Sequence, residues 1–407
     1  MTRLLLDLTH TSHTRAHTGI QRLCRSLYSE LREQAGEVVP VCYDPYETAW
    51  RPLRRWEKTN LNPPRGSVAG TRGARWPLPA KIGGLLRRFG TRFRASPAPV
   101  LSGDSLIEPE IFSPAVARVL PAILAGIPGP RVALFHDATA LRMPELSPPK
   151  TVARYPAYLQ ELLLFDGIAA ISEDSRSTLV NYWGWLGVRD APPVIALPLG
   201  IEPPAPAPFG HTTARGAAPV LLSVGSIEGR KNHLMLLEAC ETLWQRGLRF
   251  ELQLVGLVHP RTGRAALDRL NALVAAGRPI HYEGPVSEAA LARAYRACAF
   301  TVYPSLMEGF GFPVLESLSY GKPCISSAQG ALGESTRGGG CLALECTDAP
   351  ALAEAIVSLL SDPEHLDFLT AAAQRRTFKT WPAYVDELLA WMRPLPRRNH
   401  VVRAADI

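Results

Sequence analysis

Short apolar runs recur along the chain, separated by longer segments of helical periodicity. In the first half the runs cover residues 4–8, 38–43, 132–136, 168–172 and 194–197. In the second half they cover residues 220–224, 250–255, 280–283, 300–303, 323–326 and 341–344. Near-continuous apolar strands that alternate with helices are typical of parallel sheets covered on both faces. The pattern therefore predicts two doubly wound α/β domains.

A proline-rich stretch separates the two blocks of strands. Residues 203–208 contain four prolines, and proline can neither donate to a strand ladder nor continue a helix. We therefore predict an N-terminal domain at 1–199, a linker at 200–219 and a C-terminal domain at 220–380. One further helix is expected at 381–391, followed by a basic tail that runs to residue 407.

The composition is that of a globular enzyme, with 46% hydrophobic and 20% charged residues. Seven cysteines without a C-x-x-C pair indicate reduced thiols and a cytoplasmic protein. The first apolar run is too short for a signal peptide and is interrupted by Asp7. Because no run approaches the roughly 18 apolar residues that cross a bilayer, any membrane contact is expected to be peripheral.

The positive charge is concentrated in one segment. The whole chain carries +7, but residues 51–94 hold twelve Lys or Arg against one acid, Glu57, a balance of +11 that leaves about −4 for the rest. We interpret residues from about 50 to 94 as a basic insertion. It is either a solvated loop or, because residues 82–89 mix bulky apolar side chains with arginines, a contact with anionic lipid on the inner face of the plasma membrane.

The stretch SLMEGFGFPVLE, at 305–316, holds the strongest candidate chemistry. It is not a dinucleotide fingerprint, because Val314 stands where the third glycine is needed. Gly309 and Gly311 would let the backbone approach a ligand closely, and Pro313 suits the first position of a helix whose free N–H groups would face an anion. Glu308 and Glu316 would then accept from uncharged hydroxyls of the same ligand.

EGFGFPVLE, preceded by YPS and followed by SLSYGKPCISS, resembles the E-x7-E region of retaining nucleotide-sugar glycosyltransferases of family four. Further resemblances lie in HTGIQRLCRSLYSEL, LFHDATALRMPE, ISEDSRSTL, VGSIEGRKNHLMLLEA and IHYEGPVSEAALARAYRACAFTVYPS. Together they cover most of the chain except residues from about 50 to 94. The resemblance implies a GT-B fold, with two Rossmann-like domains facing a deep cleft.

The resemblance also implies roles for individual residues. Glu308 would hydrogen-bond the donor sugar and Glu316 the nucleotide ribose, although a carboxylate in a first helical turn can also serve only the helix dipole. The amides of the loop residues would cap the transferred sugar and the diphosphate; these residues are Gly309, Phe310, Gly311 and Phe312.

Six more positions complete the implied site. Arg230 and Lys231 would neutralise the diphosphate after the phosphate-binding loop at Gly225 and Ser226, although such a pair can also be a solvated feature of a helix start. Many relatives carry arginine where this chain has Ser226, so the clamp would depend on Arg230 and Lys231. His136 would touch the donor sugar, and Gly19 would let the backbone approach the diphosphate; their alternatives are a structural histidine and a plain turn residue.

A metal site is not expected. His10, His13 and His17 are close in sequence, but no carboxylate or cysteine beside them completes a ligand set. The chain also lacks an Asp-x-Asp pair. We therefore expect charge neutralisation by Arg230, Lys231 and helix N-termini, without metal or cofactor.

The expected function is a metal-independent hexosyltransferase that acts with retention. The acceptor would be a glycan or a lipid-linked glycan in surface polysaccharide or lipopolysaccharide biosynthesis. The loop GSIEGRKN, similar to loops of mannosyltransferases, favours GDP-mannose as the donor. Two alternatives stay open. A nucleotide-sugar epimerase shares the fold and the donor, and a non-enzymatic nucleic-acid binder would explain the basic segment, although that segment matches no recognised nucleic-acid module.

Overall fold

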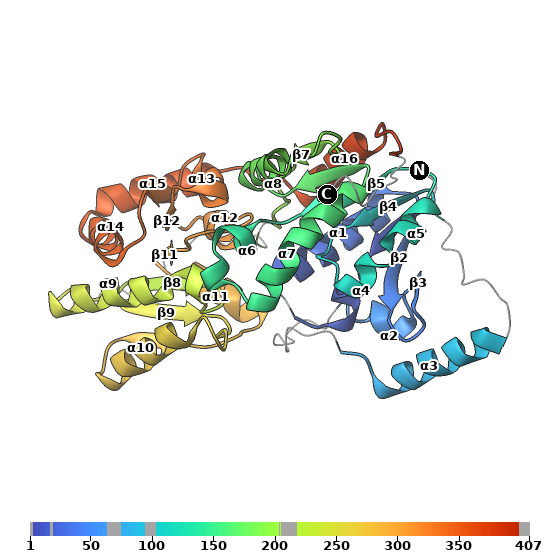
Figure 1. Ribbon diagram of the computed structural model, residues 1–407. Helices are drawn as coiled ribbons and strands as arrows, with labels where there is room; N and C mark the ends of the chain where they lie inside the picture. The colour runs from blue at the N-terminus through green and yellow to red at the C-terminus, as the bar shows by residue number, and fades with distance from the viewer. Residues whose placement is uncertain are drawn as a thin grey trace.

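The protein folds into two α/β domains, each built on one sheet (Figure 1). The computed structural model describes residues 3–16, 19–62, 75–93, 103–202, 204 and 218–398. Within these residues the N-terminal sheet has seven strands in the order β3-β2-β1-β4-β5-β6-β7. The C-terminal sheet has six, in the order β10-β9-β8-β11-β12-β13. The prediction of two doubly wound domains is confirmed.

The N-terminal sheet is parallel apart from the β2–β3 pair. Its strands are β1 (Arg3–Asp7), β2 (Glu37–Asp44), β3 (Ala49–Pro52), β4 (Ser105–Glu108), β5 (Arg131–Phe135), β6 (Gly167–Ala170) and β7 (Val194–Ala196). The helices are α1 (Gly19–Gln34), α2 (Arg55–Lys58), α3 (Leu78–Phe93), α4 (Pro114–Ala117), α5 (Leu120–Ala125), α6 (Thr139–Arg142), α7 (Pro149–Glu161) and α8 (Glu173–Trp185). Short 3-10 helices are η1 (Thr11–His13), η2 (Pro144–Leu146) and η3 (Leu162–Leu164).

All strand pairs described in the C-terminal sheet are parallel. The strands are β8 (Val220–Val224), β9 (Glu251–Val255), β10 (Ile280–Tyr282), β11 (Phe300–Tyr303), β12 (Cys324–Ser327) and β13 (Cys341–Leu344). The helices are α9 (His233–Gln245), α10 (Arg264–Ala275), α11 (Glu288–Ala297), α12 (Phe312–Ser319), α13 (Gly330–Thr336), α14 (Ala349–Ser361), α15 (Pro363–Arg375) and α16 (Trp381–Met392). The 3-10 helix η4 (Gly229–Lys231) precedes α9.

The central strands explain why the apolar runs mark the sheets so well. Every residue of β5, β6, β11 and β12 is buried, since helices cover both faces of each sheet. Each predicted strand is present within one or two residues of its expected bounds. Two short strands, β3 and β4, were not predicted.

The helix predicted at 381–391 belongs to the core of the N-terminal domain. Although α16 follows the C-terminal domain in sequence, Tyr384 and Leu388 share one buried cluster with Leu23 and Leu27 of α1 (Figure 1). The two passages of the chain between the domains lie side by side, since Ile201 N donates to Lys379 O at 2.8 Å. Residues 203 and 205–217 of the predicted linker, His17 and the tail from 399 lie outside the described residues.

The basic segment is not one solvated insertion. Arg51, counted with it above, lies in β3 with only 7% of its surface exposed and ion-pairs with Asp44 and Glu57. The segment thus begins inside the sheet, continues through α2 and includes the long helix α3. Among the described helices, none is long and apolar enough to cross a membrane. All seven cysteines are free thiols.

Candidate active site

Two loops of the C-terminal domain meet because β8 and β11 are neighbours in the sheet. One loop, residues 225–232, follows β8, and the other, residues 304–311, follows β11. The carboxyl ends of parallel strands open on the same edge, where α/β proteins bind their ligands. Leu306 N donates to Arg230 O at 2.8 Å, so the backbones of the two loops are joined directly.

Glu308 lies at the centre of a cluster of polar side chains. Its Oε2 is 2.8 Å from Arg230 Nη1, and its Oε1 is 2.5 Å from Lys231 Nζ. The Tyr303 hydroxyl donates to Oε1 at 3.0 Å and also contacts Lys231 Nζ. The structure therefore brings together Glu308, Arg230 and Lys231, three of the four side chains expected to act on the sugar and diphosphate, the fourth being His136. It adds Tyr303, which was not predicted from the sequence.

The charged groups in this cluster shift one another's pKa values. Burial raises the pKa of Glu308, but the charges of Arg230 and Lys231 outweigh burial and lower that pKa to about 2. Burial lowers the pKa of Lys231, with Glu308 opposing that effect and Arg230 adding to it. Burial also lowers the pKa of Arg230, but Glu308 and Glu228 more than compensate and raise it above its ordinary value. An anion that approached Arg230 and Lys231 would share these cations with Glu308.

Glu316 lies in the helix α12, where it has two partners. The helix begins at Phe312 after Gly311, which has φ +96°, a conformation that glycine adopts without strain. Tyr295 donates its hydroxyl to Glu316 Oε2 at 3.0 Å. Arg22 Nη1, from α1 of the other domain, lies 2.5 Å from Oε1 as an ion pair without hydrogen-bond alignment. Glu316 thus takes part in an interaction between the domains that the sequence did not reveal.

The loop after β11 presses against the N-terminal domain at a second point. A Cβ added to Gly309 would lie 2.4 Å from the carbonyl oxygen of His136, so only glycine allows this approach. The His136 ring is buried, and its Nε2 contacts Pro109 O at 2.8 Å. Burial lowers the pKa of His136, while the Pro109 carbonyl partly opposes the shift. A neutral ring that donates from Nε2 to this carbonyl keeps Nδ1 as a hydrogen-bond acceptor.

The other predicted donor-binding residues surround the same junction. Phe310 is buried, and its carbonyl accepts from Ser335 Oγ at 2.5 Å. Gly19, the first residue of α1, faces the Phe312 ring, which a Cβ there would meet at 3.8 Å. Gly225 N donates to Val255 O at 2.9 Å, and its φ is +150°. A Cβ on Gly225 would lie 3.9 Å from Lys231 Cε, so this loop passes close to the Glu308 cluster with Ser226 next in sequence.

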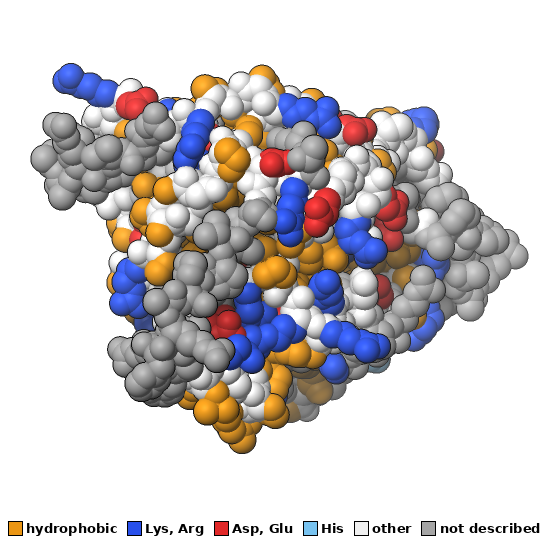
Figure 2. Space-filling model, turned by 90° about the vertical axis from the view of Figure 1, so that its right-hand side faces the viewer, with side chains coloured by type: hydrophobic (Ala, Val, Ile, Leu, Met, Phe, Trp, Pro, Cys, Tyr) orange, Lys and Arg blue, Asp and Glu red, His pale blue; other side chains and the backbone are white. Residues whose placement is uncertain are grey.

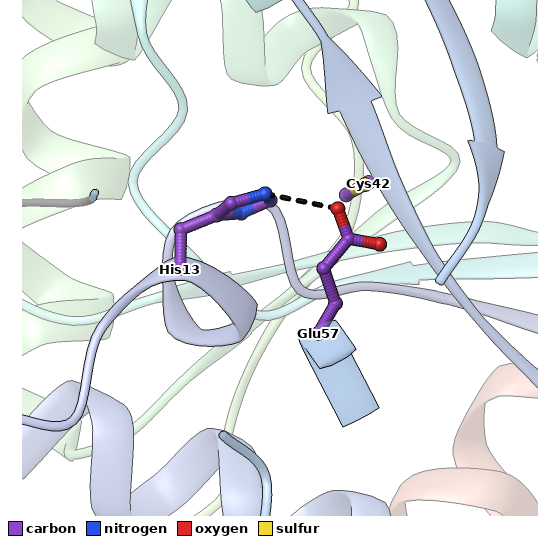
Figure 3. Close-up of side chains that lie close together, drawn as sticks. All are labelled: His13, Cys42 and Glu57. Atoms are coloured by element: carbon purple, nitrogen blue, oxygen red, sulfur yellow. Dashed lines mark hydrogen bonds and ion pairs between the residues drawn. The ribbon is translucent and has the colours of Figure 1, made fainter. Parts of the chain in front are cut away.

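A possible metal-binding group exists where none was expected from the sequence. Candidate ligand atoms of His13, Cys42 and Glu57 lie within 4.8 Å of one another, and Figure 3 shows the imidazole directed at the carboxylate. The premise that no carboxylate or cysteine lies near His10, His13 and His17 was therefore wrong for His13. Cys42 and Glu57 come from distant segments of the chain, and the fold brings them next to it.

The contacts of this group are nevertheless those of a buried structural ion pair. Both Glu57 oxygens accept from Arg51, at 2.8 and 2.7 Å, and Glu57 Oε1 is 3.1 Å from His13 Nε2. Burial raises the Glu57 pKa, but the bonds from Arg51 and His13 lower it to about 2. Burial keeps the Cys42 thiol protonated by raising its pKa. A metal ion would have to displace the Arg51 cation from Glu57 and remove the Cys42 proton.

Three buried acids below the loop after β1 were also missed. Glu110 follows β4 and accepts from His10 N at 2.6 Å and Thr11 N at 2.8 Å. Burial raises its pKa to about 7, against the lowering effect of the Thr11 hydroxyl. Burial also raises the pKa of Asp7 and Glu108, which lie on adjacent strands. These acids hold the loop that leads into α1.

Solved structures with the same architecture define the class of fold. Over 97% of this chain and 99% of the other, the structure matches a sucrose-phosphate synthase from Thermosynechococcus elongatus, with a TM-score of 0.66 and 20% identity. It also matches HepE of Anabaena in complex with UDP and glucose, with a TM-score of 0.62 and 13% identity over 97% of this chain and 100% of the other. The fold is GT-B, the two-domain architecture of these glycosyltransferases.

Sequence comparison characterises the C-terminal domain more narrowly. Residues 218–362 match the family model described as glycosyl transferases group 1. The serotype-specific mannosyltransferase WbdA of Escherichia coli is 25% identical over 345 residues, which cover 79% of this chain and 38% of that protein. The O-antigen chain mannosyltransferase B of Escherichia coli is 30% identical over 259 residues, which cover 61% of this chain and 66% of that protein. This chain therefore spans well under half the length of WbdA.

Proposed function

We propose that this protein transfers a hexosyl group from a nucleotide-diphosphate sugar to a glycan or lipid-linked acceptor, with retention of configuration and without a metal ion. The observation that carries the proposal is the Glu308 cluster, where two cations and a carboxylate lie on the ligand-binding edge of a glycosyltransferase domain. A diphosphate needs fixed positive charge, and a sugar needs hydrogen-bond acceptors, so the cluster suits the two halves of such a donor.

In this proposal Arg230 and Lys231 bind the diphosphate. As the bond between the sugar C1 and the phosphate oxygen breaks, negative charge grows on the leaving diphosphate, and fixed cations stabilise that charge most in the transition state. The N-terminus of α12 would add backbone donors and a favourable helix dipole. Arg230 and Lys231 thereby take the role that a divalent metal has in other transferases, and this is the basis for proposing metal independence.

Glu308 and His136 position the sugar, and neither acts as a covalent nucleophile. Glu308 is ionised and can accept hydrogen bonds from sugar hydroxyls. His136, on the N-terminal domain, can accept a hydrogen bond from another sugar hydroxyl through Nδ1. The acceptor hydroxyl attacks C1 on the face that the diphosphate leaves. Its proton passes to the departing phosphate oxygen, so the new C1–O bond keeps the anomeric configuration. Glu316 would bind the ribose hydroxyls of the nucleotide.

We propose GDP-mannose as the donor and surface polysaccharide assembly as the process. The support is the GSIEGRKN loop together with the names of the two Escherichia coli mannosyltransferases. HepE, crystallised with UDP and glucose, shares only the fold at 13% identity, so it makes UDP-glucose the appropriate competing donor.

The test begins with binding and ends with product. Thermal shift with GDP-mannose, UDP-glucose and other sugar nucleotides identifies the donor as the one that raises Tm at the lowest concentration. Incubation of that donor with oligomannoside or lipid-linked acceptors should release the nucleoside diphosphate. The anomeric proton coupling of the product, measured by NMR, reports retention. Conversion of the sugar nucleotide into its epimer without an acceptor would overturn the proposal in favour of an epimerase.

A further inference from the structure

The helix α3 has an apolar side that no other described part of the chain covers. It lies along the lower edge of the N-terminal domain in Figure 1 and extends away from the body. Among the side chains of α3 that the structure describes, four large apolar ones are exposed: Leu78 by 68%, Ile82 by 51%, Leu85 by 40% and Leu86 by 66%. Their spacing of four, seven and eight residues from Leu78 places all four on one face of the helix.

The opposite face of α3 packs against the domain. Gly84 is buried, and a Cβ there would lie 2.7 Å from Cβ of Tyr46. Arg87 Nε ion-pairs with Glu47 at 2.5 Å. These contacts fix the rotation of the helix about its own axis. The apolar stripe of Leu78, Ile82, Leu85 and Leu86 therefore faces away from the protein.

Positive charge flanks the apolar stripe. Lys81 lies at a helical position beside the stripe, and the sequence of α3 contains three arginines, at positions 87, 88 and 92. Apart from Glu57, residues 51–94 contain no acid. In Figure 2 apolar side chains form the lower edge of the molecule, directly beneath a group of basic ones. An apolar stripe bordered by Lys and Arg is the pattern of helices that lie in a membrane interface.

The segment that leads into α3 is attached to the loop that follows β1. Arg75 N donates to His13 O at 2.8 Å, and the Trp76 ring stacks on the His13 ring with centroids 3.8 Å apart. His13 belongs to η1, directly after β1 on the ligand-binding edge of the sheet. The start of α3 is thus anchored to the loop between β1 and α1.

We propose that α3 binds the surface of an anionic lipid bilayer, with its apolar stripe inserted at the boundary between head groups and acyl chains. Charge decides between this partner and a second copy of the chain. Two copies that paired their stripes would bring two basic segments together, whereas anionic lipid head groups neutralise the charge of such a segment. The proposal concerns binding alone and does not depend on which reaction the protein catalyses.

Co-sedimentation of the whole chain with phosphatidylcholine vesicles, with and without phosphatidylglycerol, tests this proposal. We expect binding to the anionic vesicles at low salt, release as salt rises, and little binding to phosphatidylcholine alone. Ile82→Glu with Leu86→Glu should reduce the bound fraction by roughly tenfold or more, because charges replace the inserted apolar groups. Lys81→Gln with Arg88→Gln should weaken partition by roughly fivefold for each charge removed.

Matched variants on the C-terminal domain serve as controls. Val274→Glu with Phe368→Glu introduces the same two negative charges at side chains that are 48% and 66% exposed. This pair should leave binding unchanged. Arg261→Gln with Arg264→Gln controls for the loss of two positive charges. Circular dichroism verifies the fold of each variant, and Leu78→Ser with Leu86→Ser is the milder replacement if the glutamate pair does not fold.

Three results would overturn the proposal. The first is no binding to anionic vesicles at low salt, and the second is equal loss in the α3 variants and their controls. The third is a concentration-dependent dimer, without vesicles, that the Ile82→Glu and Leu86→Glu changes convert to monomer, because the stripe would then be a contact between two copies.

Discussion

Arg22 Nη1 lies 2.5 Å from Glu316 Oε1 and joins α1 of one domain to α12 of the other. The Glu316 charge raises the pKa of Arg22 above its ordinary value, although burial opposes the shift. The same guanidinium lies 5.6 Å from the centroid of the Phe312 ring. The carboxylate proposed to hold the ribose is therefore already engaged by a cation, and the nucleotide has to share or replace this partner.

This relationship gives a test of the role of Glu316. Glu316→Gln should raise the donor dissociation constant by roughly tenfold or more, because a charged hydrogen bond is worth about 1.5–3 kcal/mol, while kcat changes less. Arg22→Ala should leave donor affinity within a few fold or improve it, since it removes a competitor for the carboxylate. Donor titration by calorimetry and steady-state kinetics measure both quantities.

Glu354→Gln, an exposed change on α14, is the matched control and should be silent. Equal and small effects of Glu316→Gln and Glu308→Gln would contradict the separate roles given to the two glutamates, because Glu308→Gln is expected to lower kcat by more than it changes donor affinity.

Lys231 allows a test of how the leaving group is stabilised. Lys231→Ala should lower kcat by roughly 10²–10³-fold, as expected on losing one preorganised group that faces developing charge. Mg²⁺ or Mn²⁺ should not restore activity, and EDTA should not inhibit the wild type. Lys150→Ala, at an exposed position, is the control for loss of a lysine. A wild-type enzyme that a chelator inactivates would exclude the proposed metal-free mechanism.

The central strands of both sheets could be predicted because burial on two faces leaves them almost wholly apolar. By contrast, β4 has only four residues and two of them, Ser105 and Glu108, are polar although buried. Its Glu108 lies next to the strand that carries Asp7, and Glu108 Oε1 accepts from Glu110 N at 3.3 Å. A pairing of this kind between strands far apart in sequence leaves no local hydrophobic pattern.

The residues of the candidate site likewise divide into those that the sequence could predict and those that it could not. Glu308, Arg230 and Lys231 could be predicted because each lies in a motif directly after a strand. Arg22 could not, since its partner is in the other domain, and nothing around it distinguishes it from an ordinary helix surface. Glu57 likewise meets His13 only through the fold.

Glu110 predicts a specific dependence of stability on pH. Its pKa is about 7 in the folded protein, mainly because of burial, against an ordinary value of 4.5. Between these values the folded protein keeps a proton that the unfolded chain has lost. The contribution of Glu110 to the free energy of unfolding is therefore full at and below about pH 4.5. It decreases by on the order of 3 kcal/mol as pH rises to about 7, and is constant above that.

Urea unfolding of the wild type and Glu110→Gln across this range isolates the effect. Asp7 and Glu108, whose pKa values are also raised by burial, are present in both proteins. The free energy of unfolding of the wild type minus that of Glu110→Gln should decrease as pH rises from 4.5 to 7. The same comparison with Glu354→Gln should give a flat difference. A flat difference for Glu110→Gln would show that Glu110 is already ionised in the folded protein.

Gly309 tests whether the contact between the domains positions the catalytic loop. In Gly309→Ala the new Cβ would lie 2.4 Å from His136 O and 3.1 Å from Asp137 Cβ, so the loop or the opposite domain has to move. Glu308 is the adjacent residue, and a displacement of about 1 Å in a positioning group can cost roughly 10² in rate. We expect kcat/KM to fall by that order, while the Tm changes by only a few degrees.

Gly184→Ala is the control, because a Cβ there meets nothing within 4 Å on the exposed side of α8. It should keep full activity and raise the free energy of unfolding by up to about 1 kcal/mol, as alanine favours helix over glycine. Full activity in Gly309→Ala would mean that the loop does not need its place against His136 for the reaction.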